Sequence, residues 1–367
     1  MKVPFLSFGE TNKEIRDELL AAFANFFDES WYILGNSVRK FEEEYAAFNG
    51  VEHCIGTSNG LDALHLALLS AGVGKGDEVI VPSNTFIATL LAVSYVGARP
   101  ILVEPDDNLY TIDVNKLEHV VTTRTKAIIP VHLYGQACNM VEIMLFAKKN
   151  GLMVVEDNAQ AQGAKWDGRL TGSWGHINAT SFYPGKNLGA LGDAGAITTN
   201  DHILASSARR LRNYGSELKY VHEVVGYNMR LDECQAAFLS IKLKRLNEWT
   251  NKRTDIAALY NEVLKDTGDL ILPQVHSKAT HVYHLYVVRT NRRDELQKHL
   301  SAAGIGTLIH YPIPPHLQKA YAHLQYRRGD FPIAERLADT CLSLPLWPGM
   351  TQSTVEFVGE TIKRFYR

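Results

Sequence analysis

A single lysine lies in a glycine-rich segment that directly follows a predicted strand. The segment is Ser181–Ala196, SFYPGKNLGALGDAGA, and Lys186 is its only basic residue. Glycine lets neighbouring backbone approach closely, and burial lowers the pKa of an amine, which makes it nucleophilic. We interpret Lys186 as a reactive amine; the other reading of a lone lysine is a solvated surface residue. The segment does not match a phosphate-binding P-loop, because the earlier glycine and the Ser or Thr after the lysine are missing.

A pair of carboxylates ends another predicted strand. Val154–Gln162, VVEDNAQAQ, carries Glu156 and Asp157 to the end of an apolar run. Open α/β sheets bind ligands at that end of their strands, although a carboxylate there can also cap the next helix. A lysine and a carboxylate at neighbouring strand ends suit pyridoxal phosphate, which needs a lysine for its Schiff base and an acidic partner for its pyridine nitrogen.

Two strand-to-helix turns offer further contacts to a ligand. Gly56–Leu68, GTSNGLDALHLAL, places free N–H groups at the start of a helix, where a phosphate binds well, and a plain turn is the other reading. In Val81–Thr89, VPSNTFIAT, Phe86 follows a predicted strand and could stack on an aromatic ring or pack in the core.

Alternating strands and helices must position these residues. Short apolar runs that end at Gly, Pro or Asp predict buried strands. These runs are His53–Gly56, Glu78–Pro82, Pro100–Glu104, Ala127–His132, Leu152–Asp157, Ala179–Tyr183 and Gly195–Thr199. The helical segments between them are Leu61–Ser70, Ala88–Val96 and Val141–Asn150. This order predicts an α/β fold with a largely parallel sheet and helices on both faces.

A second, smaller domain is predicted at the C-terminal end. An apolar stripe at Leu239, Leu243, Leu246 and Trp249 predicts one long helix from Asp232, and a polar stretch follows it. We place the boundary there, with residues 1–250 as the large domain and 251–367 as a small α+β domain. The small domain contains a predicted strand, a helix and a proline-rich segment: His284–Arg289, Arg293–Ala303 and Tyr311–Pro315. A further helix is expected over Glu14–Phe27, near the start of the chain.

The composition excludes several classes of protein. The 367 residues carry 38 Lys and Arg against 40 Asp and Glu, a net charge of -2, so we expect neither a nucleic-acid nor a membrane partner. No apolar run is long enough to span a bilayer and no signal peptide is evident, so a soluble, cytoplasmic protein is expected. The four cysteines are scattered singly, which indicates reduced thiols and no metal site. A nicotinamide-binding Rossmann enzyme is disfavoured, because no GxGxxG follows the first strand.

These motifs together resemble one known family, the DegT/DnrJ/EryC1/StrS sugar aminotransferases. The resemblance also covers Ile33–Ala46, ILGNSVRKFEEEYA; Gly226–Ala237, GYNMRLDECQAA; and His310–Tyr321, HYPIPPHLQKAY. It implies the aspartate aminotransferase fold (fold type I), with a mixed, mostly parallel seven-stranded sheet in the large domain. It also implies a pyridoxal-phosphate-dependent transaminase that uses L-glutamate and a nucleotide-linked keto-sugar.

The resemblance assigns roles to residues around the cofactor. Lys186 would form the Schiff base, Asp157 would pair with the pyridinium nitrogen, Gln160 would lie near the phenolic oxygen, and Phe86 would stack on the ring. Some relatives have histidine at the position of Lys186 and act as sugar dehydratases, so the lysine points to transamination.

The phosphate of the cofactor would be held by two subunits. Backbone N–H groups of Gly60 and Leu61 and the hydroxyl of Ser181 would contact it, and Asn228 would reach it from the other subunit of a homodimer. Many relatives have threonine where this chain has Leu61, so backbone donors and Ser181 would carry more of the binding here.

The same resemblance favours amination at carbon 3 of a dTDP-linked 3-keto-6-deoxyhexose. Amination at carbon 4 of a 4-keto sugar is the alternative, and a non-catalytic regulator that keeps the cofactor is another. Residues expected to contact the sugar nucleotide are Tyr183, Lys219, Tyr220, Arg230, His310 and Tyr311. Each of them could instead be an ordinary surface or interface residue.

Overall fold

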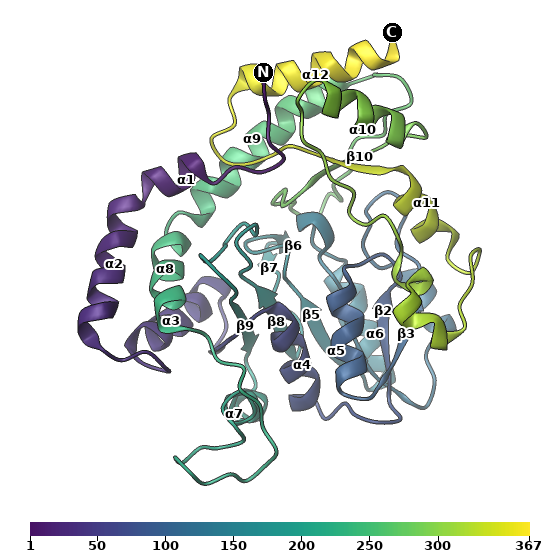
Figure 1. The fold of residues 1–367 in the computed structure, drawn as a ribbon. Helices are drawn as coiled ribbons and strands as arrows, with labels where there is room; N and C mark the ends of the chain where they lie inside the picture. The colour runs from purple at the N-terminus through teal and green to yellow at the C-terminus, as the bar shows by residue number, and fades with distance from the viewer.

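The computed structural model describes every residue from Met1 to Arg367. Its central sheet consists of β1 (His53–Thr57), β2 (Glu78–Pro82), β3 (Arg99–Val103), β4 (Thr125–Ile128), β5 (Met153–Asp157), β8 (Ile177–Ser181) and β9 (Gly195–Thr199). The strand order is β1-β9-β8-β5-β4-β2-β3 (Figure 1). Strand β9 runs antiparallel to both of its neighbours, β1 and β8, and all other neighbouring strands pair in parallel. The predicted mixed, mostly parallel seven-stranded sheet is therefore confirmed.

Helices and two small sheets complete the molecule. The α-helices are α1 (Gly9–Glu14), α2 (Arg16–Glu29), α3 (Asn36–Asn49), α4 (Gly60–Ser70), α5 (Ile87–Tyr95), α6 (Met140–Asn150), α7 (His202–Leu211), α8 (Glu233–Leu243), α9 (Leu246–Leu264), α10 (Arg293–Ala302), α11 (Pro332–Thr340) and α12 (Gln352–Tyr366). The small antiparallel sheets pair β6 (Lys165–Trp166) with β7 (Arg169–Leu170), and β10 (Tyr286–Arg289) with β11 (Cys341–Leu344). None of the helices combines the length and apolar character that crossing a membrane requires.

Side-chain alternation along the strands builds two cores, one on each face of the sheet. In β2, Val79 and Val81 pack with α4, α5 and α7, whereas Ile80 between them packs with α6 on the opposite face. The edge near β1 is covered on that opposite face by α3 and α8. Successive side chains of a strand point to opposite faces, so a strand buried on both sides reads as an uninterrupted apolar run. This is why the runs identified the strands.

One predicted helix is confirmed and another is divided in the structure. The helix expected over Glu14–Phe27 is α2, and α1, which was not predicted, precedes it; the two meet at Ile15, which leaves helical geometry at φ -113° and ψ 11° while its side chain is fully buried. The predicted long helix from Asp232 is split into α8 and α9, because the N–H of Arg245 bonds to the carbonyl of Lys242, only three residues back. An apolar stripe reports which face is buried and does not detect such a local break.

The predicted domain boundary at residue 250 falls inside α9. The first turns of this helix pack in the cores around α2, α3 and α8, and its later residues Ile256 and Tyr260 pack in a separate core with β10, β11 and α12. The start of the chain also belongs to that second core, since Val3 pairs with Ile305. We keep the division into 1–250 and 251–367 as a proposal, with α9 as the connecting helix (Figure 1).

Candidate active site

The carboxyl ends of the parallel strands bring the chemistry-bearing residues to one edge of the sheet. Asp157 is the last residue of β5 and Ser181 the last residue of β8, and these strands pair in parallel. Gly60 begins the helix after β1, and Phe86 precedes the helix after β2. Residues at the same end of parallel strands lie on the same edge.

Asp157 is buried and has no cationic partner. Its Oδ2 accepts a hydrogen bond from Thr89 Oγ1 (2.9 Å), and its Oδ1 accepts one from the N–H of Ala159 (3.2 Å). Burial raises the pKa of Asp157, opposed by the bonds from Thr89 and Ala159 and by the charge of Lys186. A protonated nitrogen placed against such a buried, unpaired carboxylate would stabilise its charged form.

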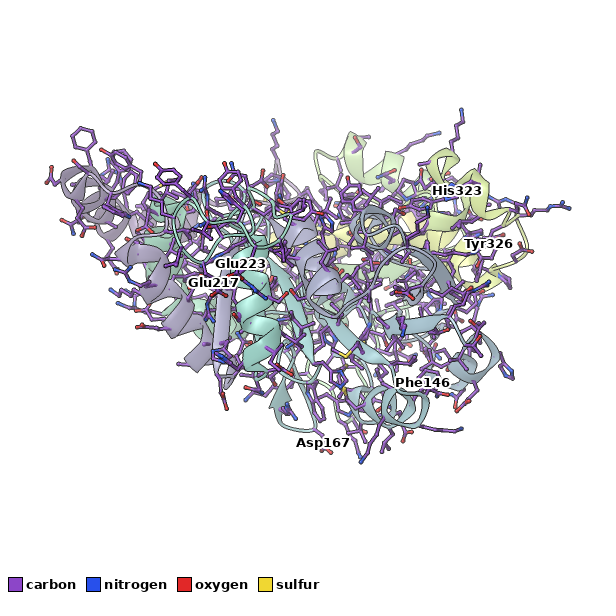
Figure 2. All side chains as sticks on the ribbon, turned by 90° about the horizontal axis from the view of Figure 1, so that it is seen from below. Phe146, Asp167, Glu217, Glu223, His323 and Tyr326 are labelled. Atoms are coloured by element: carbon purple, nitrogen blue, oxygen red, sulfur yellow. The ribbon has the colours of Figure 1, made fainter.

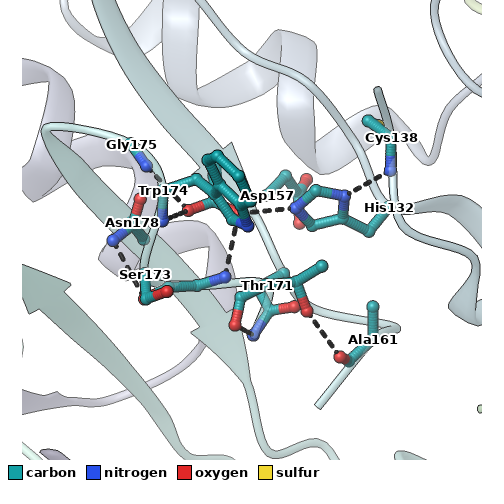
Figure 3. A network of polar contacts seen from close by, with 12 residues as sticks. His132, Cys138, Asp157, Ala161, Thr171, Ser173, Trp174, Gly175 and Asn178 are labelled. Carbon is teal, nitrogen blue, oxygen red and sulfur yellow. Dashed lines mark hydrogen bonds and ion pairs between the residues drawn. The ribbon is translucent and has the colours of Figure 1, made fainter. Parts of the chain in front are cut away.

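Behind Asp157, a buried network fixes the end of β5 (Figure 3). Glu156 accepts hydrogen bonds from the N–H groups of Gly172 (2.9 Å), Trp174 (2.6 Å) and Gly175 (2.8 Å). His132 Nδ1 accepts from the N–H of Cys138 (3.0 Å), so Nε2 carries the proton that it shares with Glu156 (2.7 Å). Glu156 therefore has a structural role, while its neighbour Asp157 faces the site.

A tight loop carries Lys186. The N–H of Lys186 bonds to the carbonyl of Tyr183 (2.8 Å), and the Asn187 amide donates to the carbonyl of Val282 (2.9 Å). A Cβ at Gly189 would lie 2.2 Å from the carbonyl oxygen of Pro184, so only glycine fits there. The glycines noted in the sequence thus allow the backbone to fold back on itself beneath the lysine.

The amine of Lys186 is held in a partly neutral state. Burial lowers its pKa to about 8, and Asp157 opposes this shift. Its Nζ makes no hydrogen bond or ion pair. Two imidazoles lie close enough to feel its charge: burial and Lys186 lower the pKa of His310 to about 4, and the same causes hold that of His284 well below its usual range. The site is therefore poor in competing cations at neutral pH.

An amide and two aromatic rings converge beside this pair. Gln160 Oε1 accepts from the N–H of Tyr134 (2.6 Å), and its Nε2 donates to the hydroxyl of Tyr311 (3.1 Å). The ring of Tyr311 packs 5.4 Å from that of Phe86, which is 50% exposed. His310 adjoins Tyr311, and its carbonyl accepts from the Tyr134 hydroxyl. Phe86 therefore faces open space rather than the core, which leaves it free to stack on a ligand.

The start of α4 forms a close cradle with the end of β8. A Cβ at Gly60 would lie 2.5 Å from Cβ of Ser181, and one at Gly195 would lie 2.4 Å from the backbone of Asn59. Asn59 caps the helix by accepting from the N–H of Asp62 (2.8 Å), which leaves the N–H groups of Gly60 and Leu61 free. Ser181 Oγ lies beside them and accepts only from the N–H of Tyr183 (3.3 Å). Free N–H groups and a hydroxyl at a helix N-terminus suit a phosphate.

Four predicted residues lie elsewhere, on or beside a loop that spans residues 213–228. Lys219, Tyr220 and Asn228 are exposed, and Arg230 donates to the side chain of Asn213 (3.0 Å). Figure 2 labels Glu217 and Glu223 of this loop, which both form ion pairs with Arg210 of α7. This chain does not bring the four residues to its own Lys186, and their roles remain predictions.

The residues at this edge fit pyridoxal phosphate. The Lys186 amine suits the aldehyde of the cofactor, and the unpaired Asp157 carboxylate suits its pyridine nitrogen. The exposed Phe86 ring suits the face of its ring, and the Gly60–Ser181 cradle suits its phosphate. Sequence reasoning missed Thr89, although it lies three residues after Phe86 on the same helix. It also missed Tyr134 and His284, which no local pattern connects to Lys186.

The chain is similar to known proteins over nearly its whole length. Residues 13–363 match the model of the DegT/DnrJ/EryC1/StrS aminotransferase family. The chain is 50% identical to a dTDP-3-amino-3,6-dideoxy-alpha-D-galactopyranose transaminase from Aneurinibacillus thermoaerophilus, over 99% of each chain. It is 49% identical to the erythromycin biosynthesis sensory transduction protein EryC1 of Saccharopolyspora erythraea, also over 99% of each.

A solved structure superimposes on the whole chain. The crystal structure of S. venezuelae DesV in complex with a ketimine intermediate gives a TM-score of 0.98 at 46% identity, and covers 100% of this chain and 99% of DesV. The predicted fold class and the predicted cofactor, pyridoxal phosphate, are confirmed. The chain therefore belongs to the DegT/DnrJ/EryC1/StrS family of pyridoxal-phosphate-dependent aminotransferases.

Proposed function

We propose that the protein transfers an amino group from L-glutamate to carbon 3 of a dTDP-linked 3-keto-6-deoxyhexose, and so makes a dTDP-3-amino-3,6-dideoxyhexose. The observation that carries this proposal is the 50% identity, over nearly the whole chain, to a transaminase named for such a product. The presence of Lys186 in the glycine-rich loop supports transamination.

Each residue at the sheet edge has a separate role in the proposed reaction. When bound, the cofactor supplies an aldehyde for the amino group and a protonated ring that withdraws electrons. Asp157 keeps the ring nitrogen protonated, and Phe86 holds the ring plane. Lys186 Nζ, freed by the amino donor, takes the proton from the α-carbon of that donor, and its lowered pKa near 8 leaves enough neutral amine for this task.

The sugar nucleotide would be bound by residues from two subunits of a homodimer. Tyr183, His310 and Tyr311 belong to this chain's own site. We assign Lys219, Tyr220, Arg230 and Asn228 to the site of the partner subunit. The loop that carries them supports this assignment, because it exposes apolar side chains such as Val225, which is 91% exposed.

Two alternatives have different consequences. Amination at carbon 4 of a nucleotide-linked 4-keto sugar would use the same Lys186 chemistry with the sugar bound in another orientation. A non-catalytic regulator, suggested by the name of the S. erythraea relative, would need no reactive amine beside Asp157. The intact pair of Lys186 and Asp157 favours an enzyme.

One experiment distinguishes these functions. The holoenzyme is incubated with L-glutamate and a panel of dTDP-linked 3-keto and 4-keto hexoses, and the new amine is located by NMR, with Lys186→Ala as the inactive control. We expect an amine at carbon 3 together with release of 2-oxoglutarate. An amine at carbon 4 would support the first alternative, and absence of transfer to every sugar would contradict the proposal.

A further inference from the structure

A small cavity lies behind the Lys186 loop. It has a volume of about 30 Å³, is partly open to solvent, and is lined by the N-terminal segment, the Pro184–Gly189 loop, and the helices α8 and α9. Its lining includes three basic side chains, Lys186, Lys242 and Arg253, and no aspartate or glutamate. Apart from Lys186, none of the residues that line this cavity takes part in the reaction derived above.

Lys242 and Arg253 are both buried cations without an acidic partner. Lys242 is 6% exposed and makes a single hydrogen bond, from Nζ to the carbonyl of Gly189 (2.7 Å). Arg253 is 5% exposed, and only its Nη1 donates, to the carbonyls of Tyr283 (3.2 Å) and Leu346 (3.4 Å). An ammonium has three donors and a guanidinium five, so most of their donors have no acceptor in the protein.

Burying two cations without a counter-charge lowers the stability of the folded protein. Because burial is not offset by a carboxylate, the pKa of Lys242 is lowered to about 8 and that of Arg253 to about 10. Elsewhere in the core the buried guanidinium of Arg212 is paired with Glu42. Buried charges in proteins are normally paired, and an unpaired one is the exception that calls for a ligand.

The cavity also offers neutral donors and room for a small ion. The side-chain amide of Asn12 makes no hydrogen bond, and Ser7, whose hydroxyl only accepts from the N–H of Gly9 (3.3 Å), lines the same space. A volume of about 10–15 Å³ suffices for one water, so a volume of about 30 Å³ has room for a halide ion or the two oxygens of a carboxylate. We propose that it is a binding site for a small anion, a halide or a carboxylate group, held by Lys242 and Arg253 against the loop that carries Lys186.

The direct test is a bromide soak of crystals of the holoenzyme, read by anomalous scattering. We expect one bromide within hydrogen-bond distance of Lys242 Nζ. Adding L-glutamate separates two sources of the anion: replacement of bromide by a carboxylate identifies the amino donor, and retention of bromide identifies a free halide. A cavity that contains neither bromide nor a carboxylate in these crystals would overturn the proposal.

A second measurement follows the site in solution. The thermal midpoint of the holoenzyme is compared in sodium bromide and in sodium tetrafluoroborate, whose anion is larger than bromide, coordinates weakly and carries no carboxylate, at equal ionic strength. We expect a saturable rise of about 2 °C in bromide. Lys242→Met should lose this rise and Lys242→Arg should keep it. Lys244→Met, which removes an exposed lysine at the end of α8, is the matched control and should also keep it. An equal rise in Lys242→Met would overturn the proposal, and if that variant does not fold, the soak of the unmodified protein decides.

Discussion

At the scale of single residues, Asp157 depends on a neighbour that carries no charge. Thr89 Oγ1 donates to Asp157 Oδ2 (2.9 Å). Burial raises the pKa of this carboxyl group, and the hydrogen bond from Thr89 opposes that rise. A carboxylate that is more easily protonated takes up a proton itself, and it is then less able to keep the cofactor nitrogen protonated. Thr89 is therefore a positioning residue for Asp157.

The variant Thr89→Val should lower kcat by about tenfold, because the hydrogen bond to the charged Asp157 is lost while the side-chain volume is kept. The hydrogen bond between the hydroxyls of Thr85 and Thr89 (2.9 Å) is lost as well. The effect should be largest at low pH, where Asp157 is most readily protonated. Steady-state kinetics over a pH series checks this, and Thr89→Ser, which restores the hydroxyl, is the control. An unchanged pH profile in Thr89→Val would show that the bond does not tune Asp157.

Residue types and their positions after strands indicated Lys186 and Asp157 as candidates, although a solvated lysine and a helix-capping carboxylate were the other readings. The family resemblance favoured the functional reading, and the structure places both residues at the same edge of the sheet. Thr89, Tyr134 and His284 could not be identified in this way, since a threonine, a tyrosine or a histidine has many structural uses. Their proximity to the site arises from contacts between segments that are distant in the sequence, such as Tyr134 with Gln160.

At the scale of elements, the Lys186 loop depends on one glycine. Gly189→Ala would place a Cβ 2.2 Å from the carbonyl of Pro184, whereas Gly185→Ala would place one in ordinary contact, 3.5 Å from the Leu6 side chain. We expect Gly189→Ala to lose about 1–3 kcal/mol of unfolding free energy and most of its activity. Denaturant unfolding and kinetics should show Gly185→Ala close to the unmodified protein. Equal effects of the two variants would contradict this role of Gly189.

The segment before β10 makes the protein sensitive to acid. Burial lowers the pKa of His281 to about 3 from an ordinary value of 6.5, while Nδ1 accepts from the N–H of Tyr283 (2.9 Å). Because the unfolded chain binds the proton first, stability is complete above pH 6.5 and is lost as the pH falls toward 3.

Replacing this imidazole should therefore flatten the acid limb of the stability profile. Between pH 6.5 and 4 the contribution of His281 amounts to about 3 kcal/mol. His281→Asn should lose less unfolding free energy over this range than the unmodified protein, as measured by denaturant titration. His323→Asn, which changes an exposed histidine, is the control. Parallel profiles for His281→Asn and the unmodified protein would rule out this histidine as the cause.

Sequence patterns located all seven strands of the sheet, and the boundaries of β2 and β9 agree residue by residue. They succeeded because a strand buried on both faces leaves an uninterrupted apolar run between turn residues. They did not detect the break near Arg245, because a break in a helix changes the backbone without changing which side chains are buried.

At the scale of the whole molecule, the proposed dimer predicts that active sites are shared. Under this proposal Lys186 of one subunit works with Asn228 of the partner subunit. Lys186→Ala and Asn228→Ala proteins should each be weakly active or inactive alone. Co-expressed, they should form mixed dimers in which one of the two sites is intact.

With random assortment, the co-expressed mixture should recover about a quarter of the normal activity, since half of the dimers are mixed and each has one good site. Size-exclusion chromatography and transaminase assays of the purified mixture check this. A mixture of Lys186→Ala with Asp157→Ala is the control. Both residues belong to the same subunit's site, so each mixed dimer carries one damaged residue in each of its two sites, and no activity should be recovered. A mixture with Asn228→Ala that recovers no more activity than this control would contradict the assignment of Asn228 to the partner's site.

The central claim concerns one amine, that of Lys186, and its covalent link to pyridoxal phosphate. The most direct measurement is reduction of the holoenzyme with borohydride, digestion with trypsin, and mass spectrometry of the peptides. We predict a single pyridoxyl group on the peptide that contains Lys186. A label on another lysine, or no label at all, would contradict the account.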